Sequence, residues 1–412
     1  MSESRRPSVI GRLASGLLAS AASLLALALI LECALRVFGI GDDAIAGPHP
    51  WTGWVHLPGL RAELKSEDPA DRRRIRFATN SLGLRDVERS LAKPPGVYRV
   101  LLLGDSFVAG AQVPVDSTVS RVSERILAAA LGHPVEVWNC GVSGYSTAQQ
   151  LLFLRHVAKD FGPDLVVLGF FAGNDVADQV APLASSLRNR PFFHQRGDSL
   201  VLDRGQLRAD GGLVGWLRRH SRLFGWATTQ LRAVRIRMHE QRATRAESGG
   251  IPPALMVYAE RPDSLWSAAW TLSERLIVEV REEARRQGAE FVLLSIPSGA
   301  QVHAEARANR PGWERWGEFP GLSLEAPERR LAVRAAECGI EFVPLLPAFR
   351  AEAERSRAPL HIHWSLHWNA LGHAVAARTL SARLVPLAGQ VRSAVPAGGT
   401  GTVAPPVPTT PN

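Results

Sequence analysis

Short apolar segments that alternate with helical segments dominate the chain after residue 98, and this alternation restricts the folds that it can adopt. Helical patterns cover 117–131, 146–160, 264–287 and 327–338, and a last helix follows Asn369. Segment 165–171 is almost entirely apolar, as expected for a strand that is covered on both faces. The apolar segments that fit strands are 99–103, 135–137, 165–171, 291–296 and 341–345. The alternation predicts an α/β fold, a three-layer α/β/α sandwich around a five-stranded parallel sheet.

A 19-residue stretch without charge, residues 13–31, precedes this region. A helix of that length spans about 28 Å, which is close to the thickness of a bilayer core. Three arginines lie in residues 1–12, and Glu32 is the first charge after the stretch. A cleaved signal peptide is the alternative, but the stretch is long and lacks an evident cleavage site. We expect a single-pass signal anchor with residues 1–12 in the cytoplasm and the remaining chain periplasmic or extracellular.

The rest of the chain divides by composition. Residues 44–95 form an N-terminal extension, and residues 96–386 form the main domain, in which 176–262 interrupt the alternation as an insertion. Residues 387–412 are rich in Pro, Gly and Thr, which predicts a disordered tail. The three cysteines, Cys33, Cys140 and Cys338, fit neither a disulfide framework nor a zinc site.

The insertion is strongly basic, with ten arginines between Arg204 and Arg245 and helical patterns near 213–224 and 228–245. A solvated basic face explains these arginines, and so does contact with anionic lipid headgroups or an acidic glycan. The overall charge of +9 alone is weak evidence for nucleic-acid binding. The predicted export argues against a nucleic-acid partner.

Chemically useful residues follow the strands of the predicted sheet, at the edge where ligands of open α/β sheets bind. Ser106 follows the first strand within Gly104-Asp105-Ser106, at a tight turn before a helix. Gly144 follows the second strand, where it either caps the next helix or directs an N–H into the crevice. Asn174 follows the third strand and fits an Asx-turn or a donor to a developing oxyanion.

A block with four histidines, residues 361–373, follows the fifth strand. A histidine there can lie opposite Ser106 and accept its proton. The block lacks an evident tetrahedral ligand set and an acidic co-ligand, so a metal site is the weaker interpretation. We expect no metal and no cofactor. His363 and His373 are alternatives to His367 as the base.

The order of these blocks resembles the SGNH (GDSL-type) hydrolase family, over about residues 98–178 and 285–386. The resemblance implies a flavodoxin-like sheet, with Ser106 as nucleophile and His367 as general base. It also implies an oxyanion hole formed by the N–H groups of Ser106 and Gly144 and the Asn174 side chain, with Asp105 in a supporting role. The segment 80–86 and the preceding anchor are similar to membrane-tethered bacterial members.

One departure from the family pattern affects the base. The family normally carries an aspartate two or three residues before the histidine, where it fixes the imidazole tautomer. This chain has Trp364 and Ser365 there. Either another group orients His367, such as Ser365, a backbone carbonyl or a carboxylate from elsewhere, or the machinery is weakened.

These observations predict a membrane-anchored, exported serine esterase that acts on O-acyl or O-acetyl bonds. Its expected partners are the membrane and an ester-bearing small molecule or envelope glycan. An O-acetyltransferase of an envelope glycan with the same site is one alternative. A non-catalytic glycan-binding homologue is another, because the usual aspartate is replaced by Ser365.

Overall fold

The structure, a computed structural model, describes most of the chain. The described residues are 9–38, 45–67, 74–184, 189–197, 199–205, 207, 212–231, 234, 251–308, 313, 316–362 and 367–394. Several predictions lie outside them, among them the roles of His363 and Ser365 and the disorder of residues 395–412.

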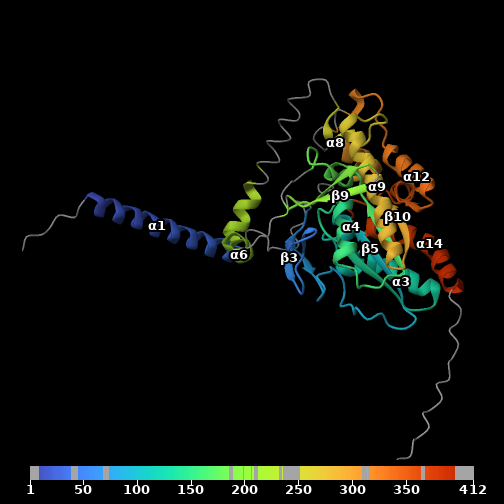
Figure 1. Cartoon of the computed structure of the whole chain (residues 1–412), viewed down its shortest axis with the longest axis horizontal. Helices are drawn as coiled ribbons and strands as arrows, with labels where there is room; N and C mark the ends of the chain where they lie inside the picture. The colour runs from blue at the N-terminus through green and yellow to red at the C-terminus, as the bar shows by residue number, and fades with distance from the viewer. Residues whose placement is uncertain are drawn as a thin grey trace, which may run out of the picture.

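A five-stranded parallel sheet forms the centre of the molecule, as predicted (Figure 1). Its strands are β5 (Tyr98–Gly104), β6 (Val135–Gly141), β7 (Leu165–Phe170), β10 (Glu290–Ser295) and β11 (Glu341–Pro344). The order across the sheet is β11-β10-β7-β5-β6, which is the flavodoxin-like arrangement. The chain moves to one side of β5 for β6 and to the other side for β7. This change of direction opens a crevice at the carboxyl ends of β5 and β7.

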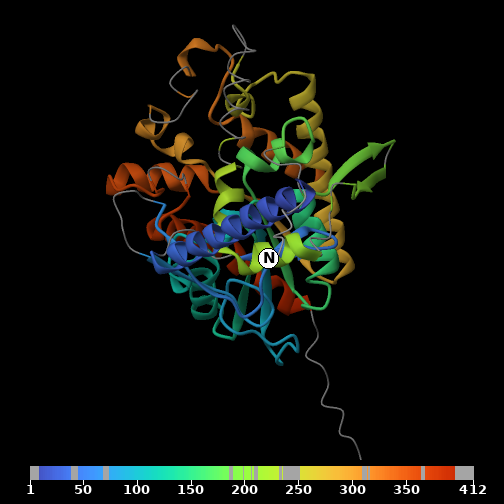
Figure 2. The ribbon, with the colours of Figure 1, turned by 90° about the vertical axis from the view of Figure 1, so that its left-hand side faces the viewer.

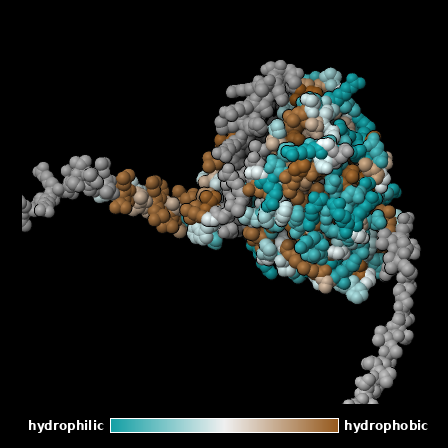
Figure 3. Space-filling view, in the orientation of Figure 1, coloured by the Kyte–Doolittle hydropathy of each residue, from teal (hydrophilic) through white to brown (hydrophobic). Residues whose placement is uncertain are grey.

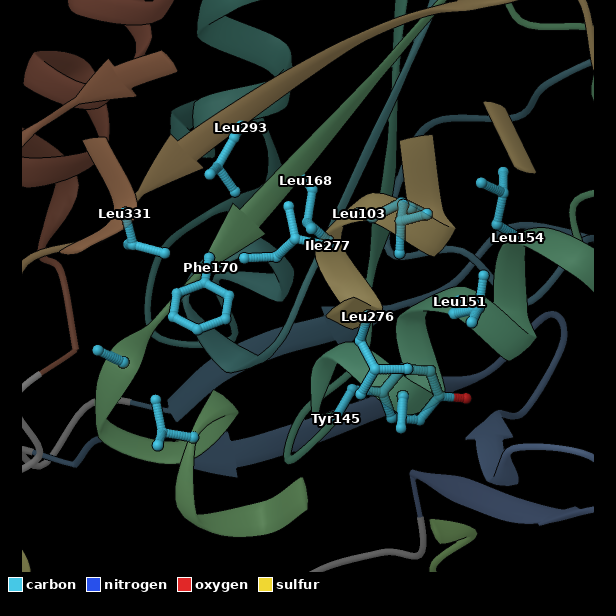
Figure 4. Close-up of a cluster of buried hydrophobic side chains, with 14 of the residues drawn as sticks. Leu103, Tyr145, Leu151, Leu154, Leu168, Phe170, Leu276, Ile277, Leu293 and Leu331 are labelled. Carbon is cyan, nitrogen blue, oxygen red and sulfur yellow. The ribbon is translucent and has the colours of Figure 1, made fainter. Parts of the chain in front are cut away.

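Helices cover both faces of the sheet. On one face lie α3 (Val119–Leu131), α13 (Leu346–Ser356) and α14 (Ala370–Ala394), and on the other lie α4 (Thr147–His156), α9 (Ser264–Arg286) and α12 (Ala326–Cys338). Figure 4 shows the apolar core on the second of these faces, where side chains of β5, β7 and β10 meet those of α4, α9 and α12. Sequence signals set the helix ends, for example at α3, which Thr118 caps and which Gly132 ends in a left-handed conformation. The helix α13 was not predicted.

The N-terminal extension folds onto this domain as two hairpins. They consist of β1 (Ala46–His49) with β2 (Gly53–His56), and of β3 (Arg61–Lys65) with β4 (Arg74–Ala78). The segment after them is anchored by Arg85, whose buried guanidinium donates to the carbonyls of Ala109 and Val113. The carboxylate of Asp86 accepts a hydrogen bond from the backbone N–H of Asn139. The extension is therefore tied to the loops at the carboxyl edge of the sheet.

The insertion between β7 and α9 contains a hairpin and short helices. The hairpin consists of β8 (Phe192–Arg196) and β9 (Ser199–Asp203), and the helices are α6 (Gly212–His220), the helical residues 222–231 and α8 (Pro253–Met256). The predicted helix near 213–224 is interrupted at Ser221. Most of the second predicted helix, 228–245, lies outside the described residues.

Short helical turns complete the chain. They are α2 (Ser106–Ala109), η1 (Val115–Ser117), α5 (Ala172–Asp175), η2 (Ala177–Gln179), α10 (Gly299–Val302), α11 (Ala304–Ala308) and η3 (Trp316–Glu318). At the N-terminus, α1 (Val9–Val37) projects away from the body of the molecule, and Figure 2 shows it across the face that carries α6.

The C-terminal boundary differs from the prediction, because α14 continues through residue 394 and the tail does not begin at 387. Leu380, Leu384 and Ala388 recur every four residues along α14 and are all buried. This apolar stripe packs against the sheet and extends the helix past Pro386.

Candidate active site

The loop after β5 presents Ser106 at the carboxyl edge of the sheet. Gly104 and Gly141 are opposite one another on β5 and β6, and both lie against the turn α2. A Cβ at Gly104 would lie 2.3 Å from Cγ2 of Val108, and one at Gly141 would lie 2.4 Å from the amide nitrogen of Ala109. Only glycine lets this turn pack so closely on the strands. Ser106 begins the single helical turn α2, which Gly110 ends in a left-handed conformation.

His367 lies beside Ser106 although 261 residues separate them. Nε2 of His367 is 2.7 Å from Oγ of Ser106, within hydrogen-bonding distance. The ring of Phe107 lies 5.1 Å from the imidazole, centroid to centroid, and limits its movement on one side. The two residues predicted as nucleophile and base are therefore in contact.

The other imidazole nitrogen contacts a carboxylate from the N-terminal extension. Nδ1 of His367 lies 2.9 Å from Oε2 of Glu67, which follows β3. Gln112 donates to the second carboxylate oxygen, Oε1, at 2.9 Å. Of the orienting groups considered above, the structure supports a carboxylate from elsewhere. Sequence analysis did not identify Glu67, and the only signal for it was the absence of an acid before His367.

The Ser106–His367–Glu67 chain is partly open to solvent. The side chain of His367 is 21% exposed and that of Glu67 is 35% exposed. When Nδ1 donates to Glu67, Nε2 carries the lone pair and accepts from the Ser106 hydroxyl. This arrangement can remove the hydroxyl proton from Ser106.

The expected oxyanion donors lie on the loops after β5, β6 and β7. The amide of Ser106 is in the first turn of α2, and Gly144 has a left-handed φ of 78°, which favours glycine. Asn174 lies in α5, and its Nδ2 donates to Oδ2 of Asp105 at 2.8 Å. A longer contact of 3.4 Å joins the same nitrogen to the Tyr145 carbonyl. Asp105 thus orients the side-chain amide of Asn174.

Two buried carboxylates hold these loops together. Asp105 caps α2 by accepting from the amide of Phe107, and burial raises the pKa of its carboxyl. Asp175 accepts from the Thr147 hydroxyl at 2.9 Å. Burial and the nearby Asp105 raise the pKa of Asp175 well above the ordinary value. These bonds connect the loops after all three strands.

Residues of the extension and the insertion support the Gly144 loop, and sequence analysis missed them. Arg190 donates to the Gly144 carbonyl at 3.1 Å and to Oε1 of Gln149 at 2.7 Å. Its guanidinium lies 5.4 Å from the ring of Trp54, whose indole N–H donates to the Ser143 carbonyl at 3.1 Å. Hydrogen bonds from Arg190 and Trp54 to the carbonyls of Gly144 and Ser143 therefore hold this loop in place.

The other histidines of the terminal block differ from His367. His373 is buried, its Nδ1 accepts from the amide of Val119, and burial lowers its pKa to about 3. Burial also lowers the pKa of His361 to about 3. His373 is thus a structural residue rather than an alternative base, and His363 lies outside the described residues. Within the described part of the chain, no group of three or more His, Cys, Asp or Glu side chains is placed to hold a metal ion.

Comparison with known proteins shows similarity of this chain to a family. The model of the GDSL-like lipase/acylhydrolase family matches residues 102–322, slightly more than half of the chain. Among curated protein sequences, none matches the chain.

Solved structures of esterases are also similar to the chain. The acetyl xylan esterase AlAXEase is 12% identical, with 69% of this chain and 98% of that chain covered and a TM-score of 0.37. TesA is 13% identical, with 70% and 99% covered and a TM-score of 0.37. The lipase/acylhydrolase from Enterococcus faecalis is 15% identical, with 70% and 96% covered and a TM-score of 0.37.

Proposed function

The chain belongs to the GDSL-like lipase/acylhydrolase family, and from that premise we propose that it is a membrane-anchored serine esterase that hydrolyses O-acyl esters. Ser106 is the nucleophile, His367 is the general base and Glu67 orients the base. The observation that carries this proposal is the continuous contact from Ser106 Oγ to His367 Nε2 and from His367 Nδ1 to Glu67.

In the first half of the reaction, Oγ of Ser106 attacks the carbonyl carbon of the ester while Nε2 of His367 accepts the hydroxyl proton. The carbonyl oxygen becomes an oxyanion, which the N–H groups of Ser106 and Gly144 and the amide of Asn174 stabilise. The intermediate collapses, the bond to the alcohol breaks, and His367 returns the proton to the leaving oxygen. An acyl group remains on Ser106.

In the second half, water replaces the alcohol. His367 accepts a proton from the water as its oxygen attacks the acyl carbonyl, and the acid leaves as Ser106 recovers its proton. The exposed fraction of His367, 21%, supports access of water to this side of the site. Glu67 stabilises the imidazolium that forms in each half without accepting its proton.

The position of Glu67 also bears on the non-catalytic alternative. The missing aspartate favours a binding homologue only if no other acid reaches His367. Glu67 lies 2.9 Å from Nδ1, where that aspartate acts in a serine–histidine–acid triad. The contact supports turnover, and hydrolysis rather than loss of activity is the function proposed.

The membrane anchor rests on α1. Residues 15–37 form an apolar helix of 23 residues, and no residue in an 18-residue stretch of it with a mean hydropathy of 2.2 is buried in the protein. A core helix of that composition would be covered by other elements. The arginines before residue 13 support a cytoplasmic N-terminus and export of the esterase domain. An alkaline phosphatase fused to the C-terminus tests this topology, because it is active only when exported.

Labelling with a fluorophosphonate probe tests the chemistry. The full chain in detergent should react with the probe at Ser106, and Ser106→Ala and His367→Ala should abolish the reaction. A folded wild-type chain that resists the probe would contradict the proposal. Acetyl esters of phenols and acetylated glycans, assayed with and without an added sugar acceptor, then separate hydrolysis from acyl transfer.

A further inference from the structure

The end of α1 is joined to the insertion by a set of charged hydrogen bonds. Glu32 accepts from the amides of Arg222 and Leu223, at 3.0 and 2.9 Å, and from the hydroxyl of Ser221 at 2.8 Å. Arg36, one turn further along α1, donates to the His220 carbonyl at 2.7 Å. Glu32 therefore caps the helix 222–231, and Arg36 binds the end of α6.

These contacts fix the depth of the insertion relative to the proposed membrane. The uncharged stretch ends at Leu31, so Glu32 lies where α1 leaves the hydrocarbon core. A carboxylate that holds two amides and a hydroxyl at that level places Ser221 at the boundary of the bilayer. Figures 1 and 2 both show α6 beside this end of α1.

The two helices joined there expose many large apolar side chains. Trp216 is 52% exposed and Trp226 is 40% exposed. Leu213, Val214 and Leu231 are 45% to 70% exposed, with Leu213 at 70%. So many exposed large apolar side chains on two short helices are unusual for a solvated surface. Figure 3 shows the apolar surface of α1 running outward from the same side of the body.

The sequence around these helices is basic. Residues 204–245 contain ten arginines but only two acidic residues, Asp210 and Glu240. Tryptophans together with arginines and exposed leucines are the composition of helices that lie in the headgroup layer of anionic membranes. An acidic glycan would account for the arginines but not for the exposed leucines and tryptophans.

We propose that residues 212–231 form a membrane-interface element, which lies in the headgroup layer of the same anionic bilayer that holds α1. The tryptophans and leucines enter the boundary of the acyl chains, and the arginines attract anionic headgroups. Glu32 and Arg36 fix this element to the anchor, so the esterase domain is held against the membrane at two places. The inference rests on the proposed anchoring of α1.

Site-specific fluorescence in nanodiscs tests the proposal. In the full chain with Cys33→Ser and Cys338→Ser, an environment-sensitive fluorophore is attached at Trp226→Cys or, separately, at Leu213→Cys. The nanodiscs contain phosphatidylcholine and phosphatidylglycerol, with a nitroxide lipid that quenches near the headgroup. Both labels should be quenched, and more strongly with phosphatidylglycerol than with phosphatidylcholine alone.

Labels at two control positions distinguish the possible outcomes. A label at Val333→Cys, which is 59% exposed on α12, should remain unquenched, and a label at Leu25→Cys in α1 should be quenched by a nitroxide deep in the acyl chains. Quenching at 25 without quenching at 226 and 213 would overturn the interface element and leave the anchor intact. Absence of quenching at all three positions would overturn both. A blue shift at 226 without quenching would indicate a protein partner and also overturn the proposal.

Discussion

Ser106 is held in a turn that packs against the sheet, whereas Glu67 contacts His367 from a hairpin at the surface. The turn is fixed by the close approach of Gly104 and Gly141 and by the buried Asp105. Glu67 is 35% exposed and accepts a hydrogen bond from Gln112. The proposed nucleophile is thus part of a parallel sheet with a strand-end crevice, while the proposed orienting acid comes from the extension.

This difference implies that Ser106 and Glu67 contribute unequally to the rate of the proposed reaction. A group that forms and breaks bonds at a rigid strand end is indispensable for the reaction. A partly exposed acid that orients the base can be replaced in part by water, so its loss should leave measurable catalysis.

The largest effect on kcat is expected from substitution of Ser106, at the edge of the sheet. Ser106→Ala should lower kcat for an activated acetate ester by about 10⁴-fold or more, because no acyl-enzyme can form. His367→Ala should cause a loss of similar size. Steady-state hydrolysis of 4-nitrophenyl acetate by the full chain in detergent measures both. Substantial turnover by folded Ser106→Ala would show that another residue is the nucleophile.

Removal of the charge on the extension should have a smaller effect. Glu67→Gln should lower kcat by about 10²-fold, less than the roughly 10⁴-fold loss at a buried triad acid, because the tautomer is no longer fixed. KM should change little. Glu63→Gln, an exposed glutamate in β3 of the same hairpin, is the matched control and should be unaffected. Equal rates for the two variants would contradict a role for Glu67.

The buried histidine beside the site should reveal itself in the pH dependence of stability. The pKa of His373 is about 3 in the folded protein against about 6.5 when unfolded. Between these values only the unfolded chain binds the proton, so stability falls as pH drops below 6.5 and continues to fall to about 3. Protonation of this one group in the unfolded chain should lower the free energy of unfolding by about 2 kcal/mol at pH 5.

Denaturant unfolding at pH 7 and pH 5 measures this difference. The loss on acidification should be smaller in His373→Gln than in wild type. His194→Gln, at an exposed histidine of β8, should keep the wild-type loss. An unchanged loss in His373→Gln would mean that His373 is accessible to protons in the folded state.

The smallest effect on kcat is expected at Gln112, which contacts Glu67. Gln112→Leu removes the donor to Oε1 of Glu67 and should lower kcat by roughly threefold to tenfold, which corresponds to a hydrogen bond of about 1 kcal/mol. In a Glu67→Gln background the same substitution should have no further effect on kcat. A loss of similar size in both backgrounds would assign Gln112 a role independent of Glu67.

Local patterns were sufficient to predict the sheet and the residues at its edge. The near-continuous apolar segments gave β5, β7 and β10 within one or two residues, and strand ends carry Ser106, Gly144 and Asn174. The contact of His367 with Ser106 followed from strand order. Glu67 could not be predicted in this way, because it lies 300 residues from its partner in a hairpin with no local signature.

The support of the Gly144 loop was unpredictable for a similar reason. Arg190 lies in the insertion and Trp54 in the extension, and no sequence spacing connects either residue to the strand-end loops. The C-terminal boundary was misjudged because the Pro, Gly and Thr content of residues 387–412 suggested a tail, while the buried Leu384 and Ala388 continue α14.

A double-mutant cycle between Glu67 and His367 tests the central claim most directly. Hydrolysis of an activated acetate ester is compared among wild type, Glu67→Gln, His367→Ala and the double variant. If Glu67 acts through the imidazole, Glu67→Gln lowers the rate about 10²-fold in the wild-type background and has no effect when His367 is absent. An equal loss in both backgrounds, or no loss in either, would contradict a catalytic triad completed by the N-terminal extension.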